Sequence, residues 1–212
     1  MEEFDEKVQL EGLIDRLKQF LGYNPRNAGA HYNLGLAFLK KGQFEDAEFA
    51  FKMALEIDPD MVEAHINLGG LYLRQEKLDE AVACNEKALE INSRAVLARN
   101  NIGFARLLQG RLDDAAAAFQ GALDLQPDLV PARLSLARVL NQKGDLEGAM
   151  AQYERIISKD PSFALAHYSL AQGRLAQGRV EEAERHYQEA AALGFPVDEE
   201  VGRRIKTALN RS

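Results

Sequence analysis

Asparagine recurs along this chain at intervals of 34 residues. Asn33, Asn67 and Asn101 share this spacing, and serine takes the next two places, at Ser135 and Ser169. Asparagine is a poor helix former, because its side chain competes for backbone hydrogen bonds. A side-chain amide carries both donors and an acceptor, so a row of amides could bind successive peptide groups of an extended chain. The pattern therefore suggests peptide binding, with solvated polar residues as the alternative.

Histidine and cysteine form no catalytic or metal-binding pattern. His31, His65 and His167 occupy one repeat position, and Arg99 and Arg133 take the two places between them. Side chains so far apart suit a role in covering helix pairs better than metal ligation. The single cysteine has no histidine close in sequence, and no phosphate loop, zinc-binding helix or nucleophile-elbow motif is present. We therefore predict no enzyme activity, no metal and no cofactor.

The elements that must position the asparagines are five consecutive units of 34 residues, the first from Ala28 to Met61. Each unit contains a pair of an aliphatic and a small residue at its seventh and eighth positions. These pairs are Leu34-Gly35, Leu68-Gly69, Ile102-Gly103, Leu136-Ala137 and Leu170-Ala171. A fixed period of this length predicts stacked helical hairpins, each of which contacts only its neighbours.

Glycine marks the turn inside most of these units. Gly42, Gly110, Gly144 and Gly178 stand at the fifteenth position, where a left-handed residue can end the first helix at little steric cost. Glu76 replaces glycine in the second unit, so that turn should be slightly strained.

This pattern resembles the tetratricopeptide repeat (TPR) family, whose signature combines a leucine-glycine pair with alanine, an aromatic residue and proline at set spacings. The resemblance implies an all-α fold, a right-handed α-solenoid of five repeats with an N-terminal and a C-terminal capping helix. The expected domains are an N-terminal capping helix or half repeat at 1–27, repeats at 28–61, 62–95, 96–129, 130–163 and 164–197, and a C-terminal capping helix at 198–212.

In this family the first helix of each repeat lines a concave groove that binds peptides. Carried onto this chain, the resemblance implies a groove formed by Asn33, Asn67, Asn101, Tyr32, Leu36, Lys40, Ile66, Arg74, Asn100, Phe104, Leu134, Arg138 and Tyr168. The asparagine row is similar to the one in the repeat superhelix of O-linked N-acetylglucosamine transferase, which holds peptide backbones. The implied ligand is an extended or helical segment with apolar anchors and some acidic residues.

Both ends of the chain read as caps. Subtracting one period places Leu13, Leu17 and Phe20 at repeat positions twenty, twenty-four and twenty-seven, so 1–27 is expected to stack as an unpaired second helix. Phe20 stands where the other units mostly carry alanine, so this helix is expected to pack differently. A swapped or self-docking arm is the alternative. At the other end, Asp198 can cap a helix whose apolar stripe includes Ile205. A solubilising lid is expected there, and a basic contact point formed by Arg203, Arg204, Lys206 and Arg211 is the alternative.

Asn85 stands where the other four units carry Phe or Tyr. We interpret it as a local adjustment around a solvated edge. A specific buried hydrogen bond is the alternative.

The composition of the chain disfavours some classes of binding partner. Lys and Arg number 26 against 33 Asp and Glu, a net charge of −7 with a pI near 5.2, which argues against nucleic acid and anionic membranes. No apolar run approaches the length that spans a bilayer, and the acidic N-terminus is unlike a secretory signal. We expect a cytoplasmic protein with a protein or peptide partner and no membrane insertion.

The function predicted from these features is a non-catalytic scaffold or adaptor for protein–protein interaction. The alternatives are a self-assembling homo-oligomeric scaffold, an assembly or secretion chaperone and, more remotely, the accessory repeat arm of an enzyme.

Overall fold

The computed structural model describes residues 2–211 of the 212-residue chain, and side chains from Val8 onward. Residue 1 of the predicted N-terminal cap and residue 212 of the predicted C-terminal cap lie outside the described residues. Over residues 2–211 the chain forms twelve α-helices and no strand. The predicted all-α solenoid class is confirmed. The helices belong to two compact units, of which the first ends at Arg111 and the second begins at Leu112.

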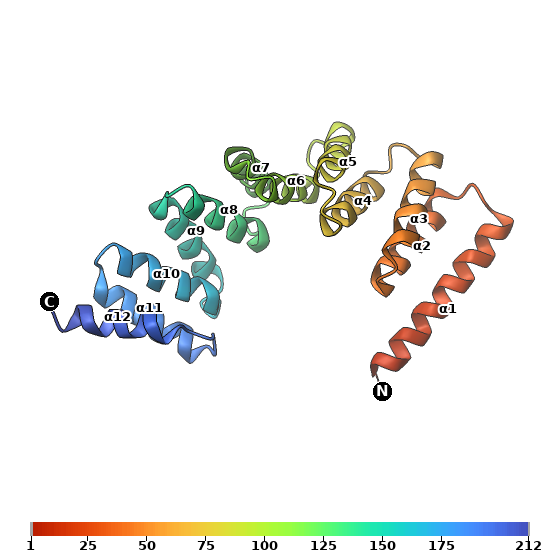
Figure 1. Cartoon of the computed structure of the whole chain (residues 1–212). Helices are drawn as coiled ribbons and strands as arrows, with labels where there is room; N and C mark the ends of the chain where they lie inside the picture. Colours follow the sequence, from red (N-terminus) through yellow and green to blue (C-terminus); the bar gives the residue numbers. More distant parts are fainter. Residues whose placement is uncertain (1, 212) are drawn as a thin grey trace. The chain divides into compact units, whose positions relative to one another are not determined.

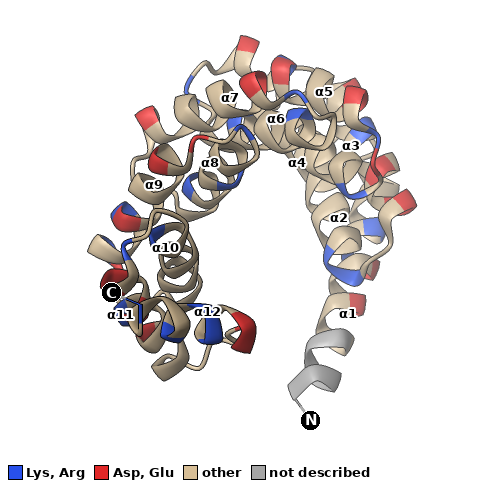
Figure 2. Cartoon of the chain, turned by 60° about the vertical axis from the view of Figure 1, so that its left-hand side comes forward, with Lys and Arg blue, Asp and Glu red and all other residues tan. Residues whose placement is uncertain are grey.

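The first unit contains six helices that follow one another as antiparallel neighbours (Figure 1). They are α1 (Glu2–Tyr23), α2 (Ala28–Lys41), α3 (Phe44–Ile57), α4 (Val62–Arg74), α5 (Leu78–Ile91) and α6 (Val96–Leu108). Each helix packs on the next as far as α6, and α4 also packs on α6. Within this unit, α2 and α4 lie on one side, with α3 and α5 on the other (Figure 2).

The second unit also contains six helices. They are α7 (Leu112–Leu125), α8 (Val130–Gln142), α9 (Leu146–Lys159), α10 (Ala164–Ala176), α11 (Val180–Ala192) and α12 (Glu199–Leu209). Each packs on its successor in the chain. Acidic residues in the first turn of the second helix of each pair, such as Asp113 and Asp114 of α7, complement the helix dipole.

The turns inside the hairpins have the predicted backbone conformation. Gly42, Gly110, Gly144 and Gly178 have φ between 74° and 82°. Glu76 adopts φ 58° at the equivalent position and is the only non-glycine residue with positive φ in the described chain. A side chain in this left-handed region costs about 1–2 kcal/mol, so the turn of the second repeat is the strained one.

The core of each hairpin depends on a close approach between a small residue and a large one. Phe51 of α3 is fully buried, and a Cβ added to Gly35 of α2 would lie 2.6 Å from its ring. The alanines that face the neighbouring helix, such as Ala47 and Ala54, are also fully buried. A larger side chain at these positions would separate the helices.

The N-terminal helix packs through a stripe that coincides only in part with the residues at repeat positions. Ile14 and Leu21 are buried, whereas Leu13 and Phe20 are 40% and 45% exposed. The apolar stripe by which α1 packs on α2, its main neighbour, is formed by Leu10, Ile14, Leu17 and Leu21. Leu17 belongs to this stripe, whereas Leu13 and Phe20 do not, because a helix with one main neighbour buries a narrow stripe with steps of four and three residues.

The C-terminal helix covers the last hairpin. The Asp198 side chain caps α12 by accepting a hydrogen bond from the Glu200 N–H at 2.8 Å. Val201 and Ile205 are buried against a cluster that includes Ala183 of α11. A Cβ on Gly202 would lie 2.7 Å from the Tyr187 hydroxyl, so glycine allows this close approach.

Candidate functional site

A pocket of about 510 Å³ lies between α1 and α2 of the first unit. Nine residues line it: Gln9, Leu10, Leu13, Arg16, Leu17, Asn33, Leu36, Ala37 and Lys40. Asn33, Leu36 and Lys40 belong to the predicted peptide-binding set, and the structure brings these three together. The α1 residues of the pocket were missed, although the spacing of the leucines on α1 is visible in the sequence.

Helix packing explains why this pocket stays open. Leu10 and Leu17 are partly buried against α2, and the more exposed Leu13 extends the apolar wall. Glu11 of α1 pairs with Lys41 of α2 at 3.2 Å, which joins the two helices. The pocket thus has apolar walls between two rigid helices, a form common in sites that bind an apolar side chain.

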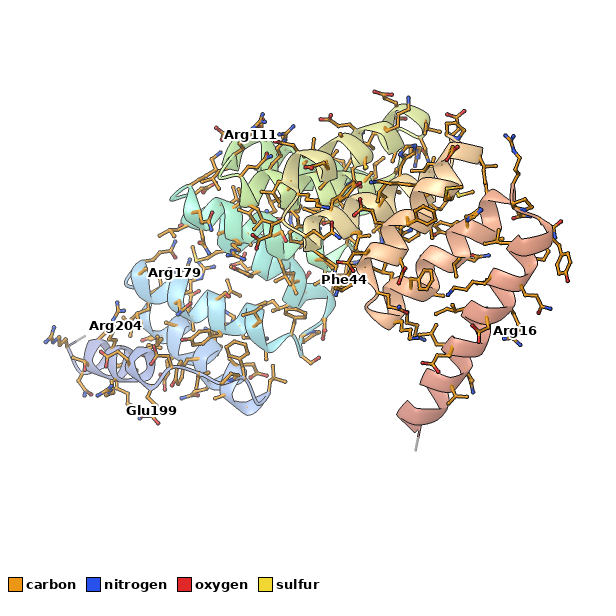
Figure 3. The ribbon with its side chains drawn as sticks, turned by 45° about the vertical axis from the view of Figure 1, so that its right-hand side comes forward. Arg16, Phe44, Arg111, Arg179, Glu199 and Arg204 are labelled. Carbon is orange, nitrogen blue, oxygen red and sulfur yellow. The ribbon has the colours of Figure 1, made fainter. Side chains whose placement is uncertain are left out.

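The polar groups of the pocket are cationic or neutral. Arg16 of α1 is exposed (Figure 3), and Lys40 of α2 is exposed as well. Asn33 is exposed, and its side chain makes no hydrogen bond to residues 8–211. Two cations beside an apolar wall favour a ligand that carries an apolar anchor and a carboxylate.

The predicted asparagine row is partly used inside the protein. The Asn67 amide nitrogen donates to the Tyr32 hydroxyl at 3.1 Å and to the Glu63 carbonyl at 2.8 Å. The Asn101 amide nitrogen donates to the Ile66 carbonyl at 3.4 Å and to the Asn85 side-chain oxygen at 3.2 Å. Both N–H donors of each amide are therefore engaged, which leaves the amide oxygen as the group open to a ligand.

Asn85 is buried, contrary to our interpretation of a solvated edge. It is 0% exposed, and its amide donates to the Ala81 carbonyl at 2.7 Å. A Cβ on Gly69 would lie 2.1 Å from its nitrogen. The alternative, a specific buried hydrogen bond, is the correct one, because the amide satisfies Asn101 as well as its own helix.

The other predicted residues of the first unit have mixed surroundings. Tyr32 packs on Phe51 with ring centroids 5.9 Å apart, and burial raises the pKa of its hydroxyl. The Arg74 guanidinium lies 4.6 Å from the centroid of the Phe44 ring, at the start of α3 (Figure 3). Three residues are half-buried or buried on α4 and α6: Ile66, Asn100 and Phe104.

Three predicted residues belong to the second unit. Leu134 packs on the core around α8 and α9, and Arg138 is exposed on α8. Tyr168 is covered by the segment before α12: its ring centroid lies 5.1 Å from that of Phe195, and its hydroxyl accepts from the Asp198 N–H at 3.4 Å. Tyr168 therefore serves the C-terminal cap in this structure.

The fourth position of each repeat binds the backbone of the preceding turn. His31, His65 and His167 donate through Nε2 to the carbonyl oxygens of prolines six residues earlier, at 2.8–3.0 Å. Arg99 and Arg133 donate through their guanidinium groups to the carbonyl oxygens of Ser93 and Pro127, also six residues earlier. Either histidine or arginine can occupy this position, because both side chains supply an N–H donor of suitable reach.

Cys84 is poorly suited to act as a nucleophile. Burial raises the pKa of its thiol to about 11, so the thiolate is scarce at neutral pH. No group of three or more metal-ligating side chains occurs among the described residues.

His167, which is buried, and His186, which is half-buried, form a pair in the second unit. Their Nδ1 atoms lie 3.1 Å apart, and His167 Nε2 must carry a proton because it contacts the Pro161 carbonyl. When both rings are neutral, His186 therefore donates through its Nδ1–H to the Nδ1 atom of His167. Burial, followed by His167 and the nearby Arg185 and Arg174, lowers the pKa of His186, while Glu182 opposes the shift.

This pair predicts a stability that declines with acidification. Because the folded pKa of His186 is below its unfolded value of about 6.5, the unfolded chain binds more protons, and unfolding becomes easier as pH falls below about 6.5. His186→Gln should make the urea midpoint less dependent on pH across that range. His31→Gln, at an equivalent position to His167 but without a histidine partner, is the control. Equal pH slopes in the wild type and His186→Gln would exclude this role.

The repeated hairpins, the small residues between them and the pocket at one end define an α-helical repeat protein built to present surfaces. Tetratricopeptide repeat models match residues 28–61, 62–94, 106–173 and 164–189, which together span most of the chain. The chain belongs to the tetratricopeptide repeat family. Proteins of this family are scaffolds for protein–protein interaction, so the partner is a protein or peptide. No curated protein matches the chain in sequence.

Several solved structures have the same fold. MamA is 26% identical with a TM-score of 0.71, over 76% of this chain and 94% of that one. YrrB, a TPR protein with an unusual peptide-binding site, is 21% identical with a TM-score of 0.72, over 90% and 97%. PilF of Pseudomonas aeruginosa is 23% identical with a TM-score of 0.75, over 89% and 86%. No helix in the described chain is long and apolar enough to cross a membrane.

Proposed function

We propose that this protein is a non-catalytic adaptor that binds a short segment of a partner protein in the α1–α2 pocket. The observation that carries the proposal is the pocket itself, with leucines from both helices and Arg16 and Lys40 at its edge. Its volume of about 510 Å³ is within the range of small-ligand sites and admits one or two side chains of a peptide.

The neighbouring asparagines can extend this site along the first unit. Asn33 lies in the pocket, while Asn67 and Asn101 follow on α4 and α6 with amide oxygens that can accept from a peptide N–H. The partner segment is therefore extended, with an apolar residue in the pocket, a carboxylate near Arg16 or Lys40, and backbone groups along the asparagines. The acidic charge of the chain and its single cysteine support a cytoplasmic protein with no nucleic-acid partner.

Selection of peptides from a random display library tests this proposal. The enriched peptides should share a large apolar residue close to Asp or Glu. Leu13→Asp should weaken their binding by about tenfold or more. The substitution places a carboxylate in the apolar wall of the pocket, where it also repels the carboxylate of the bound peptide. Arg16→Glu should weaken the binding of acidic peptides by a similar factor.

Matched variants separate the pocket from general effects on charge and folding. Leu146, on α9 of the second unit, is 42% exposed, almost the same as Leu13, so Leu146→Asp is the control for the apolar wall. Arg94, exposed before α6, is the control for Arg16. Circular dichroism checks that each variant keeps its helices. Selected peptides whose affinity is unchanged by Leu13→Asp and Arg16→Glu would reject the pocket.

Self-assembly is the second candidate, and the exposed apolar side chains of α1 favour it. Val8, Leu13, Phe20 and Tyr23 are 40–81% exposed on one helix. Such a surface can contact a second copy. Light scattering over a range of concentrations separates the two functions. An oligomer that dissociates on deletion of 1–27 would favour self-assembly, and a monomer at all concentrations would exclude it.

A further inference from the structure

The C-terminal helix reverses the charge of the chain. The whole protein carries −7, yet α12 and the residue pair after it contain four cations, Arg203, Arg204, Lys206 and Arg211. Figure 2 shows acidic residues at the start of α12 and basic residues further along it. Capping by Val201 and Ile205 uses only one stripe of this helix, so the basic stripe has no role in the core.

A trough of about 670 Å³ runs along this basic stripe, between α10 and α12. Its lining consists of Leu175 from α10 and, from α12 onward, Glu200, Arg203, Arg204, Thr207, Ala208 and Arg211. These positions repeat at steps of three and four residues and so form one face of the helix. Leu175 and Ala208 provide an apolar floor, and three guanidinium groups stand around it.

The trough has an excess of unpaired positive charge. Glu200 is its single carboxylate and pairs with Arg203 at 2.8 Å. Arg204 and Arg211 have no carboxylate within 4.0 Å among residues 8–211, and Arg204 is exposed on α12 (Figure 3). The two arginines are seven residues apart, which corresponds to about 10 Å along a helix.

We propose that the α10–α12 trough binds an acidic segment of a protein partner, separately from the α1–α2 pocket. Guanidinium groups pair with carboxylates through two parallel hydrogen bonds, which gives Arg204 and Arg211 a defined chemical preference. In a polyproline II segment, side chains three residues apart lie on the same side of the chain and about 9 Å apart, which is close to the spacing of the two arginines. The apolar residues between these carboxylates contact Leu175 and Ala208.

An anionic membrane is the less favourable ligand. A lipid surface is broad, and electrostatic attraction to it needs a wide basic face. Here the cations line a recess, while Glu199 and Glu200 lie on the same helix and the chain as a whole is acidic. A narrow acidic chain enters the recess without bringing these carboxylates against a negative surface.

A fluorescein-labelled peptide that repeats Asp-Leu-Ala is the probe, because it offers carboxylates three residues apart in every register. The same peptide with asparagine for aspartate is the ligand control. Binding is measured by fluorescence anisotropy on the full chain. We expect saturable binding of the aspartate peptide alone, weakened about tenfold or more in Arg204→Glu/Arg211→Glu.

Two further variants make the test specific to the trough. Arg26→Glu/Arg94→Glu changes the net charge equally at exposed sites of the first unit and should alter affinity by less than about twofold. Glu200→Gln removes the competing carboxylate and should raise affinity. Arg204→Gln/Arg211→Gln removes the two positive charges without adding acidic charge to α12. Weaker peptide binding by this variant therefore cannot be attributed to unfolding of α12 by added acidic residues.

Three results would overturn the proposal. One is the absence of saturable binding to the aspartate peptide. Another is equal weakening by both charge-reversal pairs, which would show an unspecific charge effect. The third is binding to vesicles of phosphatidylserine that depends on Arg204 and Arg211 while the peptide does not bind. Leu13→Asp should leave trough binding unchanged, so this test stands apart from that of the α1–α2 pocket.

Discussion

Phe51→Ala is expected to lower the free energy of unfolding by about 3–5 kcal/mol, the range for removal of a fully buried aromatic ring. Phe51 is 0% exposed, and its ring fills the space above Gly35 and beside Tyr32. Neither neighbour can close the cavity: glycine has no side chain to extend, and the Tyr32 hydroxyl is held by Asn67. Urea unfolding followed by circular dichroism measures the loss.

Phe49 provides a control on the same helix. It is 66% exposed, so Phe49→Ala removes a ring of the same size without opening a cavity. Its effect should be within about 0.5 kcal/mol of zero. Equal destabilisation by the two substitutions would mean that helix propensity or the unfolded state, rather than packing above Gly35, controls the stability of this repeat.

Ile205→Ala should remove about 2–5 kcal/mol from the packing of α12 on the last hairpin. Ile205 is fully buried in the cluster with Val201 and Ala183. Because each hairpin of a repeat protein contacts only its neighbours, the loss should remain local. Amide hydrogen exchange should accelerate in α11 and α12, while protection in α3 to α5 stays unchanged.

Thr207 is the matched position for this experiment. It is exposed on α12, two residues from Ile205, so Thr207→Ala should leave exchange in α12 nearly unchanged. Ile205→Ala should also weaken binding of the acidic peptide, because the α10–α12 trough forms only when α12 is packed in place. Uniform acceleration throughout the chain would instead show that the repeats unfold as one cooperative body.

Two features that the sequence does not reveal have a common cause. The repeat positions do not indicate which face of α1 is buried, because α1 packs mainly on α2 and buries Ile14 and Leu21. Asn85 was assigned to a solvated edge because its partner, Asn101, lies on the next hairpin. In both cases the deciding contact comes from another helix, and the residue type alone does not reveal it.

The sequence by itself determined the helical hairpins, their period and the conformation of their turns. These depend on local chemistry: Gly42 and its equivalents tolerate positive φ, and the recurrence of small residues requires close helix pairs. It also indicated Asn33, Leu36 and Lys40 as candidates. Only the tertiary structure joined them to Leu10, Leu13 and Arg16 in one pocket, and placed Leu175 beside Arg204 and Arg211. Such surfaces combine side chains from separate helices, so they depend on the rotation of each helix about its axis, which long-range packing decides.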